Sequence, residues 1–372
     1  MKKFITIILL LVTVFSLNIT YAFGAETGTS AADTAAPAFN INMEYTVAEL
    51  QQIALSNSRQ AAADDMDIKR KEMAVRTVRS DSRSMSDSIL SVTKPLDVVL
   101  ELDSAKKTKQ DHLNQLKADV YKAVMNIQLC EKEITLQEQK LANAEEQLTM
   151  AKARFKASTI TQDDLDSAQY NVDDRKVSLA NTKEKLGSLT LELKKLLNQP
   201  LDTKPVKIKG DIKQDTFEDI DVDFQLNNLY KTETSVSKVS GKLDIAKTAM
   251  DIAQKLYNKG DLYYDNSALD LQEAEYNFNS AKTALEVKVK NAYNDMVNKQ
   301  DDLELASKYT DLMTKKLDNS KIKYDKGTIS KDDYMKAKEA LLDAQYAELS
   351  SVVGFNGARV DFRDAIGIAE SK

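Results

Sequence analysis

Two long stretches of the sequence contain neither glycine nor proline, and this restricts the possible folds more than any other feature. One runs from Leu96 to Leu186, and the other lies between Gly260 and Gly327. Since glycine and proline are the residues that most disfavour helix interiors, both stretches are predicted to be helical over most of their length. Charged residues make up 30% of the chain and aromatic residues 6%, a composition typical of long helices and coiled coils.

Apolar residues recur every seven positions through both stretches, as they do in coiled coils. In the first stretch one series of positions is large: Leu113, Val120, Ile127, Ile134, Leu141, Leu148 and Phe155. A second series is mostly small: Leu116, Ala123, Cys130, Gln137, Ala144 and Ala151. Facing large and small positions allow helices to approach closely. The ascending helix, expected from about Leu96 to Ala157 after a break at Pro95, would be about 90 Å long.

Two short segments, 154–168 and 323–337, are nearly alike and predict tight turns between antiparallel helices. A constant offset of 169 relates them. In the second turn, Gly327 can take the left-handed conformation that ends a helix, and Ser330 can cap the next one together with Asp333. The first turn has Ser158 at the glycine position, so it is predicted to be looser. The fold expected is therefore all-α: elongated antiparallel coiled-coil hairpins in an internal duplication.

The start of the chain has the pattern of a secretory signal peptide. Lys2 and Lys3 precede an apolar run that ends near Leu17, and small residues for cleavage follow at 22–25. An uncleaved anchor helix is the alternative, and either places the protein in the cell envelope or outside the cell. The expected organisation is a signal peptide (1–25), a flexible linker (26–45), a first helical repeat (46–200), a connector (201–221) and a second helical repeat (222–368).

The sequence offers no sign of an enzyme. It contains no nucleophile–base set, no metal-spaced histidine or cysteine group and no glycine-rich phosphate loop, so no cofactor or metal is expected. Cys130 is the only cysteine and is predicted to be buried, whereas the lone His112 is predicted to lie on the surface. The net charge of −6 gives no reason to expect nucleic acid as a partner. The acidic stretch 215–223 is interpreted as a solvated connector in preference to a cation site.

Three segments together resemble the TolC type of outer-membrane efflux proteins. Residues 46–57 are similar to the family's opening helix, residues 272–278 to the start of its second long helix, and residues 323–333 to its helix-hairpin tip. The resemblance implies that each half supplies two lengths of helix and a β-hairpin. It also implies that three chains assemble into a helical tunnel whose tips face an adaptor protein of the membrane-fusion type.

The resemblance assigns partner docking to the two turns. The implied docking residues are Ser158, Thr159, Ile160 and Asp164 in the first turn and Gly327, Thr328, Ile329 and Asp333 in the second. The family often has an aspartate three residues after Asp333; here that position is Lys336, which puts an acidic ring at the tunnel entrance in doubt.

The two segments where the family has its membrane-spanning strands lack the pattern of such strands in this sequence. Residues 258–267 are too few for a hairpin of two spanning strands, and residues 80–95 are polar and serine-rich. The chain is therefore predicted to keep the family's helices without its β-barrel.

Two functions remain open from the sequence. The first is an exported TolC-like component of an efflux or secretion assembly, a homotrimer by the resemblance, that forms or extends a helical conduit and docks an adaptor through its tips. The second is an exported coiled-coil spacer or binding module with no transport role.

Overall fold

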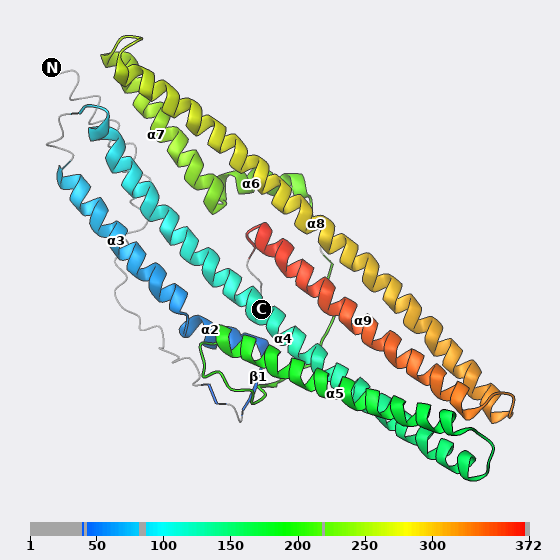
Figure 1. The fold of residues 1–372 in the computed structure, drawn as a ribbon. Coiled ribbons are helices and arrows are strands. Elements are labelled where there is room, and N and C mark those ends of the chain that lie inside the picture. Colours follow the sequence, from blue (N-terminus) through cyan, green and yellow to red (C-terminus); the bar gives the residue numbers. More distant parts are fainter. Residues whose placement is uncertain (1–38, 41–42, 82–86, 218–219, 369–372) are drawn as a thin grey trace. The chain divides into compact units, whose positions relative to one another are not determined.

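The computed structural model describes residues 39–40, 43–81, 87–217 and 220–368. Their helices are α2 (Val47–Ser56), α3 (Arg59–Asp81), α4 (Leu90–Lys156), α5 (Gln162–Leu196), α6 (Val222–Thr232), α7 (Thr234–Leu256), α8 (Leu262–Asp325) and α9 (Lys331–Ala365) (Figure 1). The strands found in these residues are β1 (Glu44–Tyr45) and β2 (Lys207–Ile208), which pair in parallel. The all-α prediction is confirmed.

The two longest helices each fold back on a shorter partner. α4, with 67 residues, forms an antiparallel hairpin with α5, and α8, with 64 residues, forms one with α9. The first half of α4 packs against α3, and the first part of α8 packs against α7 (Figure 1). At 1.5 Å per residue, each long helix extends about 100 Å.

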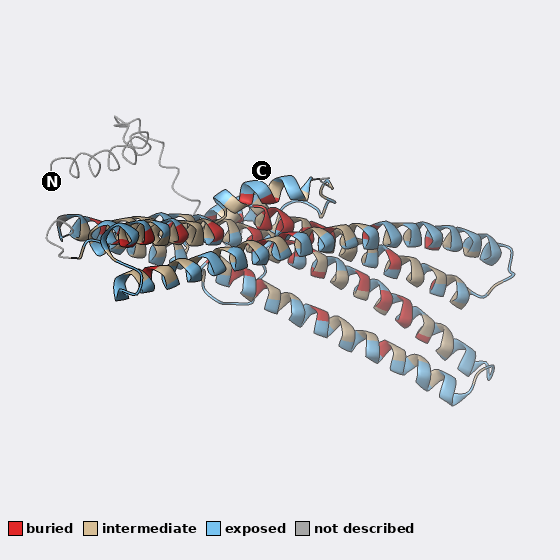
Figure 2. Ribbon diagram, turned by 90° about the horizontal axis from the view of Figure 1, so that it is seen from above, coloured by how far each residue is buried: buried red, intermediate tan, exposed pale blue. Residues whose placement is uncertain are grey.

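The buried residues gather in the middle of this helical unit, where the two hairpins begin (Figure 2). One core joins α2, the middle of α4, the end of α5 and β2, around Leu50, Val124 and Leu193. The other joins α6, α7, α8 and α9, around Val289 and Phe355. Closer to the first turn only a small cluster of Ala144, Leu148 and Val172 remains.

The predicted apolar series of α4 is buried only in part. Val120, Ile127 and Leu148 are buried, Leu113, Ile134 and Leu141 are half-buried, and Phe155 is exposed. Of this series only Phe155, next to the turn, is exposed, because α4 has fewer helices to pack against there. Cys130 is buried as predicted, and its thiol donates to the carbonyl oxygen of Thr182.

The beginning of α4 differs from the prediction. The helix starts at Leu90, so Pro95 lies inside its second turn and does not mark the break. A proline in the middle of a helix costs about 3 kcal/mol. Near the start of α4 the loss of one backbone hydrogen bond is offset in part by the Asp87 carboxylate, which accepts from the amides of Ile89 and Leu90. The hydroxyl of Thr93 also donates to the carbonyl of Ile89, which supports this first turn.

The segments expected to be a linker and a connector are partly built into the cores. Tyr45, placed in the linker by the sequence, lies in β1, is buried and stacks on Phe39. In the connector, the fully buried Asn356 of α9 donates to the carbonyl of Lys213 and accepts from the amide of Asp215. The carboxylate of Asp215 accepts a hydrogen bond from the Tyr121 hydroxyl at 2.9 Å. At this residue the prediction of a solvated acidic connector is therefore wrong. The sequence pattern could not show these contacts, because their partners are remote in the chain.

The two segments where the family resemblance places strand hairpins lie between α3 and α4 and between α7 and α8. Between α7 and α8 the chain passes from helix to helix through a turn at 257–261, without a strand. Between α3 and α4, residues 82–86 lie outside the described part, as does the predicted signal peptide.

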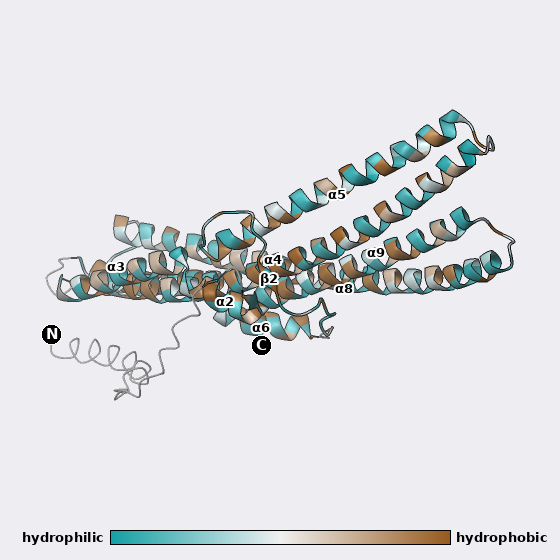
Figure 3. Ribbon diagram, turned by 90° about the horizontal axis from the view of Figure 1, so that it is seen from below, coloured by the Kyte–Doolittle hydropathy of each residue, from teal (hydrophilic) through white to brown (hydrophobic). Residues whose placement is uncertain are grey.

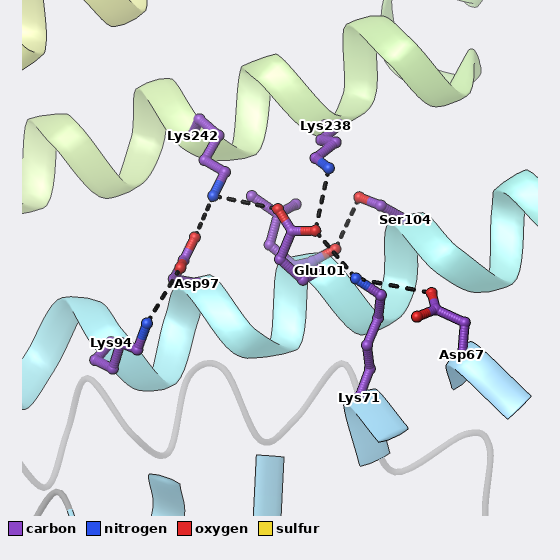
Figure 4. Close-up of polar contacts among 9 residues, drawn as sticks. Asp67, Lys71, Lys94, Asp97, Glu101, Ser104, Lys238 and Lys242 are labelled. Atoms are coloured by element: carbon purple, nitrogen blue, oxygen red, sulfur yellow. Dashed lines mark hydrogen bonds and ion pairs between the residues drawn. The ribbon is translucent and has the colours of Figure 1, made fainter. Parts of the chain in front are cut away.

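A polar cluster holds α3, α4 and α7 together (Figure 4). Glu101 of α4 accepts from Lys238 of α7 at 3.1 Å and lies 3.4 Å from Lys71 of α3 and 3.3 Å from Lys242 of α7. Burial raises the pKa of Glu101, but the hydrogen bonds from Lys238 and Lys242 outweigh burial and lower it to about 2. α7 also comes very close to α4 at Gly241, where a Cβ atom would meet the Leu100 side chain at 2.4 Å.

Candidate functional site: the two helix-hairpin turns

The first turn closes α4 by a Schellman motif. Ser158 has a positive φ of 55°, the left-handed conformation, and its amide donates to the carbonyl of Phe155 at 2.8 Å. The amide of Thr159 donates to the carbonyl of Arg154 at 3.0 Å, and the Thr159 hydroxyl donates to the same carbonyl at 2.9 Å. Three donors therefore satisfy two of the four carbonyl groups that the end of α4 leaves open.

The second turn has the same arrangement. Gly327 has φ 71°, and its amide donates to the carbonyl of Tyr324 at 2.8 Å. The amide and the hydroxyl of Thr328 both donate to the carbonyl of Lys323 at 2.9 Å. Since the distances agree with those of the first turn to within 0.1 Å, the prediction of a looser first turn is wrong. The hydrogen bonds that Ser158 and Thr159 donate to the end of α4 hold the serine in its left-handed conformation.

Each turn leads into a capping box, as the sequence predicts. The Thr161 hydroxyl accepts from the Asp164 amide at 3.2 Å, and the Asp164 carboxylate accepts from the Thr161 amide at 2.9 Å. Ser330 and Asp333 repeat this at 3.1 and 3.2 Å. The backbone hydrogen bond from Thr161 holds the pKa of Asp164 below its usual value, and the hydroxyl of Ser330 does the same for Asp333.

The exposed part of the turns is small and mostly polar. Ser158, Thr159, Asp164 and their counterparts in the second turn are exposed, whereas Ile160 and Ile329 are half-buried. In the second turn, Tyr324 and Tyr334 stack with their ring centroids 5.4 Å apart, which packs α8 against α9 directly beside the turn. Each of the two threonine hydroxyls donates its hydrogen bond to a carbonyl within its own turn. Toward a partner protein these hydroxyls can therefore act only as hydrogen-bond acceptors.

Polar side chains join α4 of the first hairpin to α9 of the second. The Gln147 amide donates to Asp332 at 2.9 Å, and the Asn143 amide donates to Glu339 at 3.3 Å. Glu146 forms an ion pair with Lys331. The sequence does not reveal these contacts, because residues nearly two hundred positions apart meet without any shared pattern.

These contacts fix the relative heights of the turns. Both turns lie at the same end of the helical unit, as Figures 1 and 3 show. Gln147 is level with Asp332, near the start of α9, while α4 continues for nine further residues to Lys156. The first turn therefore extends about 10 Å beyond the second. The expectation from the sequence that the two turns lie at matching heights is wrong.

In the part of the chain that the structure describes, no group of three His, Cys, Asp or Glu side chains is placed to hold a metal ion. His112 is exposed, and its Nδ1 lies 2.9 Å from an Asp64 carboxylate oxygen. Over the same described residues, no helix combines the length and the apolar character needed to cross a membrane.

Two long antiparallel hairpins, with shorter helices beside the first halves of α4 and α8, define the class. This is the helical fold of the TolC-type outer membrane efflux channels. A membrane protein from Pseudomonas aeruginosa has a TM-score of 0.70 at 12% identity, over 86% of this chain and 90% of that one. The CmeC outer membrane channel of Campylobacter jejuni has 0.68 at 11% identity, over 87% of each chain. The outer membrane protein VceC of Vibrio cholerae has 0.65 at 13% identity, over 86% and 96%.

At these identities the likeness is one of fold. No protein-family model matches the sequence. No curated protein matches it either.

Proposed function

We propose that the protein is an exported TolC-like component of an efflux or secretion assembly, which forms or extends a helical conduit and docks a membrane-fusion-type adaptor through its two turns. The observation that carries the proposal is the pair of turns with matching backbone geometry at one end of this fold. Gly327 and Ser158 provide the left-handed residue in each, and Thr328 and Thr159 the exposed side chain.

Stability alone accounts for part of this geometry. The capping boxes and Schellman motifs would serve any helical hairpin, and the threonine hydroxyls support the helix ends. The common offset of 169 also relates the ends of α5 and α9, where Asn198 and Gly367 have positive φ. The docking role therefore rests on the shared fold and on the position of both turns at the same end of the helical unit. It needs a test that separates adaptor binding from folding.

The test uses Thr328→Arg, which adds bulk to the exposed face of the second turn. Binding to purified membrane-fusion-type adaptors from the same cells is expected to fall at least about tenfold, while helicity by circular dichroism stays unchanged. Thr328→Val is the first control, because it removes the hydroxyl hydrogen bond without adding bulk. Ser280→Arg is the second, because it places the same side chain on an exposed position in the first third of α8, far from the turn.

Unchanged adaptor binding in Thr328→Arg, or a loss that follows a loss of helicity, would leave the turns with a structural role only. The alternative function, an exported coiled-coil spacer or binding module, is favoured by the length of the hairpins. The mass of the purified chain in solution separates the two. A mass of three chains supports the conduit, and a mass of one chain supports the spacer.

A further inference from the structure

Two glycines, Gly354 and Gly357, lie on one face in the second half of α9. A glycine inside a helix lowers stability relative to alanine, so it needs a reason such as a left-handed backbone or a close neighbour. Neither glycine has a positive φ. A Cβ atom on Gly357 would meet no neighbouring described atom within 4 Å, and one on Gly354 would meet only the flexible side chain of Lys299, at 3.7 Å. The described part of the chain therefore does not use the space that these glycines leave.

This space is a hollow of about 260 Å³ lined by α4, α8 and α9. α9 lies between the two long helices (Figure 1). The glycines form the floor together with Met125 of α4 and Val353. Asn356, which binds the connector, lies on the other side of α9, because successive residues of a helix are about 100° apart. The hollow therefore opens on the face of α9 away from the connector.

The charged groups around the hollow leave one negative charge unbalanced. Lys122 of α4 forms an ion pair with Asp361 of α9. Lys299 of α8 lies 3.3 Å from the Asp302 carboxylate. Asp295 of α8 lines the hollow, is exposed and forms no ion pair with another described residue. An apolar floor beside an unpaired carboxylate suits a ligand that has both an apolar body and a positive charge.

Size and charge together narrow the class of ligand. Small-molecule sites usually measure about 300–1,000 Å³, so this smaller hollow suits a molecule of about one aromatic ring with a substituted ammonium group. An anion would be repelled by Asp295. A divalent metal ion needs several oxygen ligands, and the hollow offers it a single unpaired carboxylate. An apolar side chain from a second copy of the chain would cover Asp295 without pairing its charge.

We propose that the hollow between α4, α8 and α9 is a binding site for a small organic cation with an apolar body. Gly354, Gly357 and Met125 contact the apolar body, and Asp295 contacts the ammonium group. Because the hollow is open to solvent, binding is weak and rapidly reversible. The site lies within a single chain, so it depends neither on an adaptor nor on the proposed conduit.

The experiment measures binding of benzyltriethylammonium to the full chain, as processed by the producing cells, by ligand-observed NMR. A dissociation constant of about 1 mM is expected for a cation of this size. The anion p-toluenesulfonate, which carries the same kind of ring, is expected to bind at least about fivefold more weakly.

The first variant fills the hollow. Gly357→Leu is expected to lower binding of the cation at least about tenfold, because the leucine side chain takes its place. The denaturant midpoint is expected to stay or rise, since leucine favours a helix more than glycine does. Gly187→Leu is the matched control, because Gly187 lies in α5 beside a different hollow of about 490 Å³. It is expected to bind the cation as the unchanged chain does.

The second variant removes the charge. Asp295→Asn is expected to weaken binding of the cation about fivefold. Asp270→Asn is its control, since Asp270 is exposed on α8 about 40 Å away. The proposal is overturned if the unchanged chain does not bind the cation, if it binds the anion equally well, or if either variant binds the cation as its control does. It is also overturned if Gly357→Leu lowers the mass of the chain in solution, because the hollow would then hold a side chain of a second copy.

Discussion

Ser158 and Gly327 occupy equivalent positions with left-handed backbone conformation. Substitutions at these two positions are therefore expected to change the unfolding free energy in opposite directions. A Cβ in this conformation costs about 1–2 kcal/mol, and a glycine costs about 0.5–1 kcal/mol in unfolded-chain entropy. Gly327→Ala is therefore expected to lower the unfolding free energy by about 1 kcal/mol, and Ser158→Gly to raise it by about 0.5 kcal/mol. Denaturant unfolding of both variants beside the unchanged chain measures the two effects, and a change of the same sign in both would contradict the shared geometry. The left-handed positions and caps were predictable because each is local in sequence. The hydrogen bonds that the Thr159 and Thr328 hydroxyls donate were not predictable, because the sequence does not determine which rotamer each side chain adopts.

Helix α4 is tied to its neighbours by Glu101, and this predicts a pH dependence. The carboxylate is more acidic in the folded chain, with a pKa of about 2 against 4.5 for the free group, so its contribution is complete above about pH 4.5 and disappears as the pH falls toward 2. Glu101→Gln is expected to cost about 2 kcal/mol at pH 7 and progressively less on acidification. Glu304→Gln, whose ion pair with Lys308 is exposed, is the control and should cost less than about 0.5 kcal/mol. Thermal unfolding between pH 7 and pH 2 tests this, and a difference between Glu101→Gln and the unchanged chain that is constant with pH would refute it. Sequence periodicity predicted the long helices and their direction, since heptads and caps are repeated along the chain. It did not predict that α4 passes through Pro95 or that α9 lies against α4, because those outcomes depend on tertiary contacts.

The whole helical unit has its two large cores at the bases of the hairpins, and only a small cluster lies toward the first turn. Local opening is easiest where few apolar contacts must be broken, so backbone protection should decline along each hairpin toward its turn. In hydrogen exchange, amides around Ile127 and Met296 are expected to exchange slowest, and those within two helical turns of Ser158 and Gly327 at least about a hundredfold faster. Ile127→Ala removes a side chain that is 1% exposed, so it should cost about 2–4 kcal/mol and weaken protection throughout the first hairpin. Leu148→Ala should instead weaken protection mainly between Leu148 and the first turn. If the two variants change protection in the same amides, or if the unchanged chain shows equal protection along its hairpins, the hairpins unfold as single units and their bases do not hold the structure. A gradient would mean that the proposed docking ends can adjust to a partner while the bases stay folded.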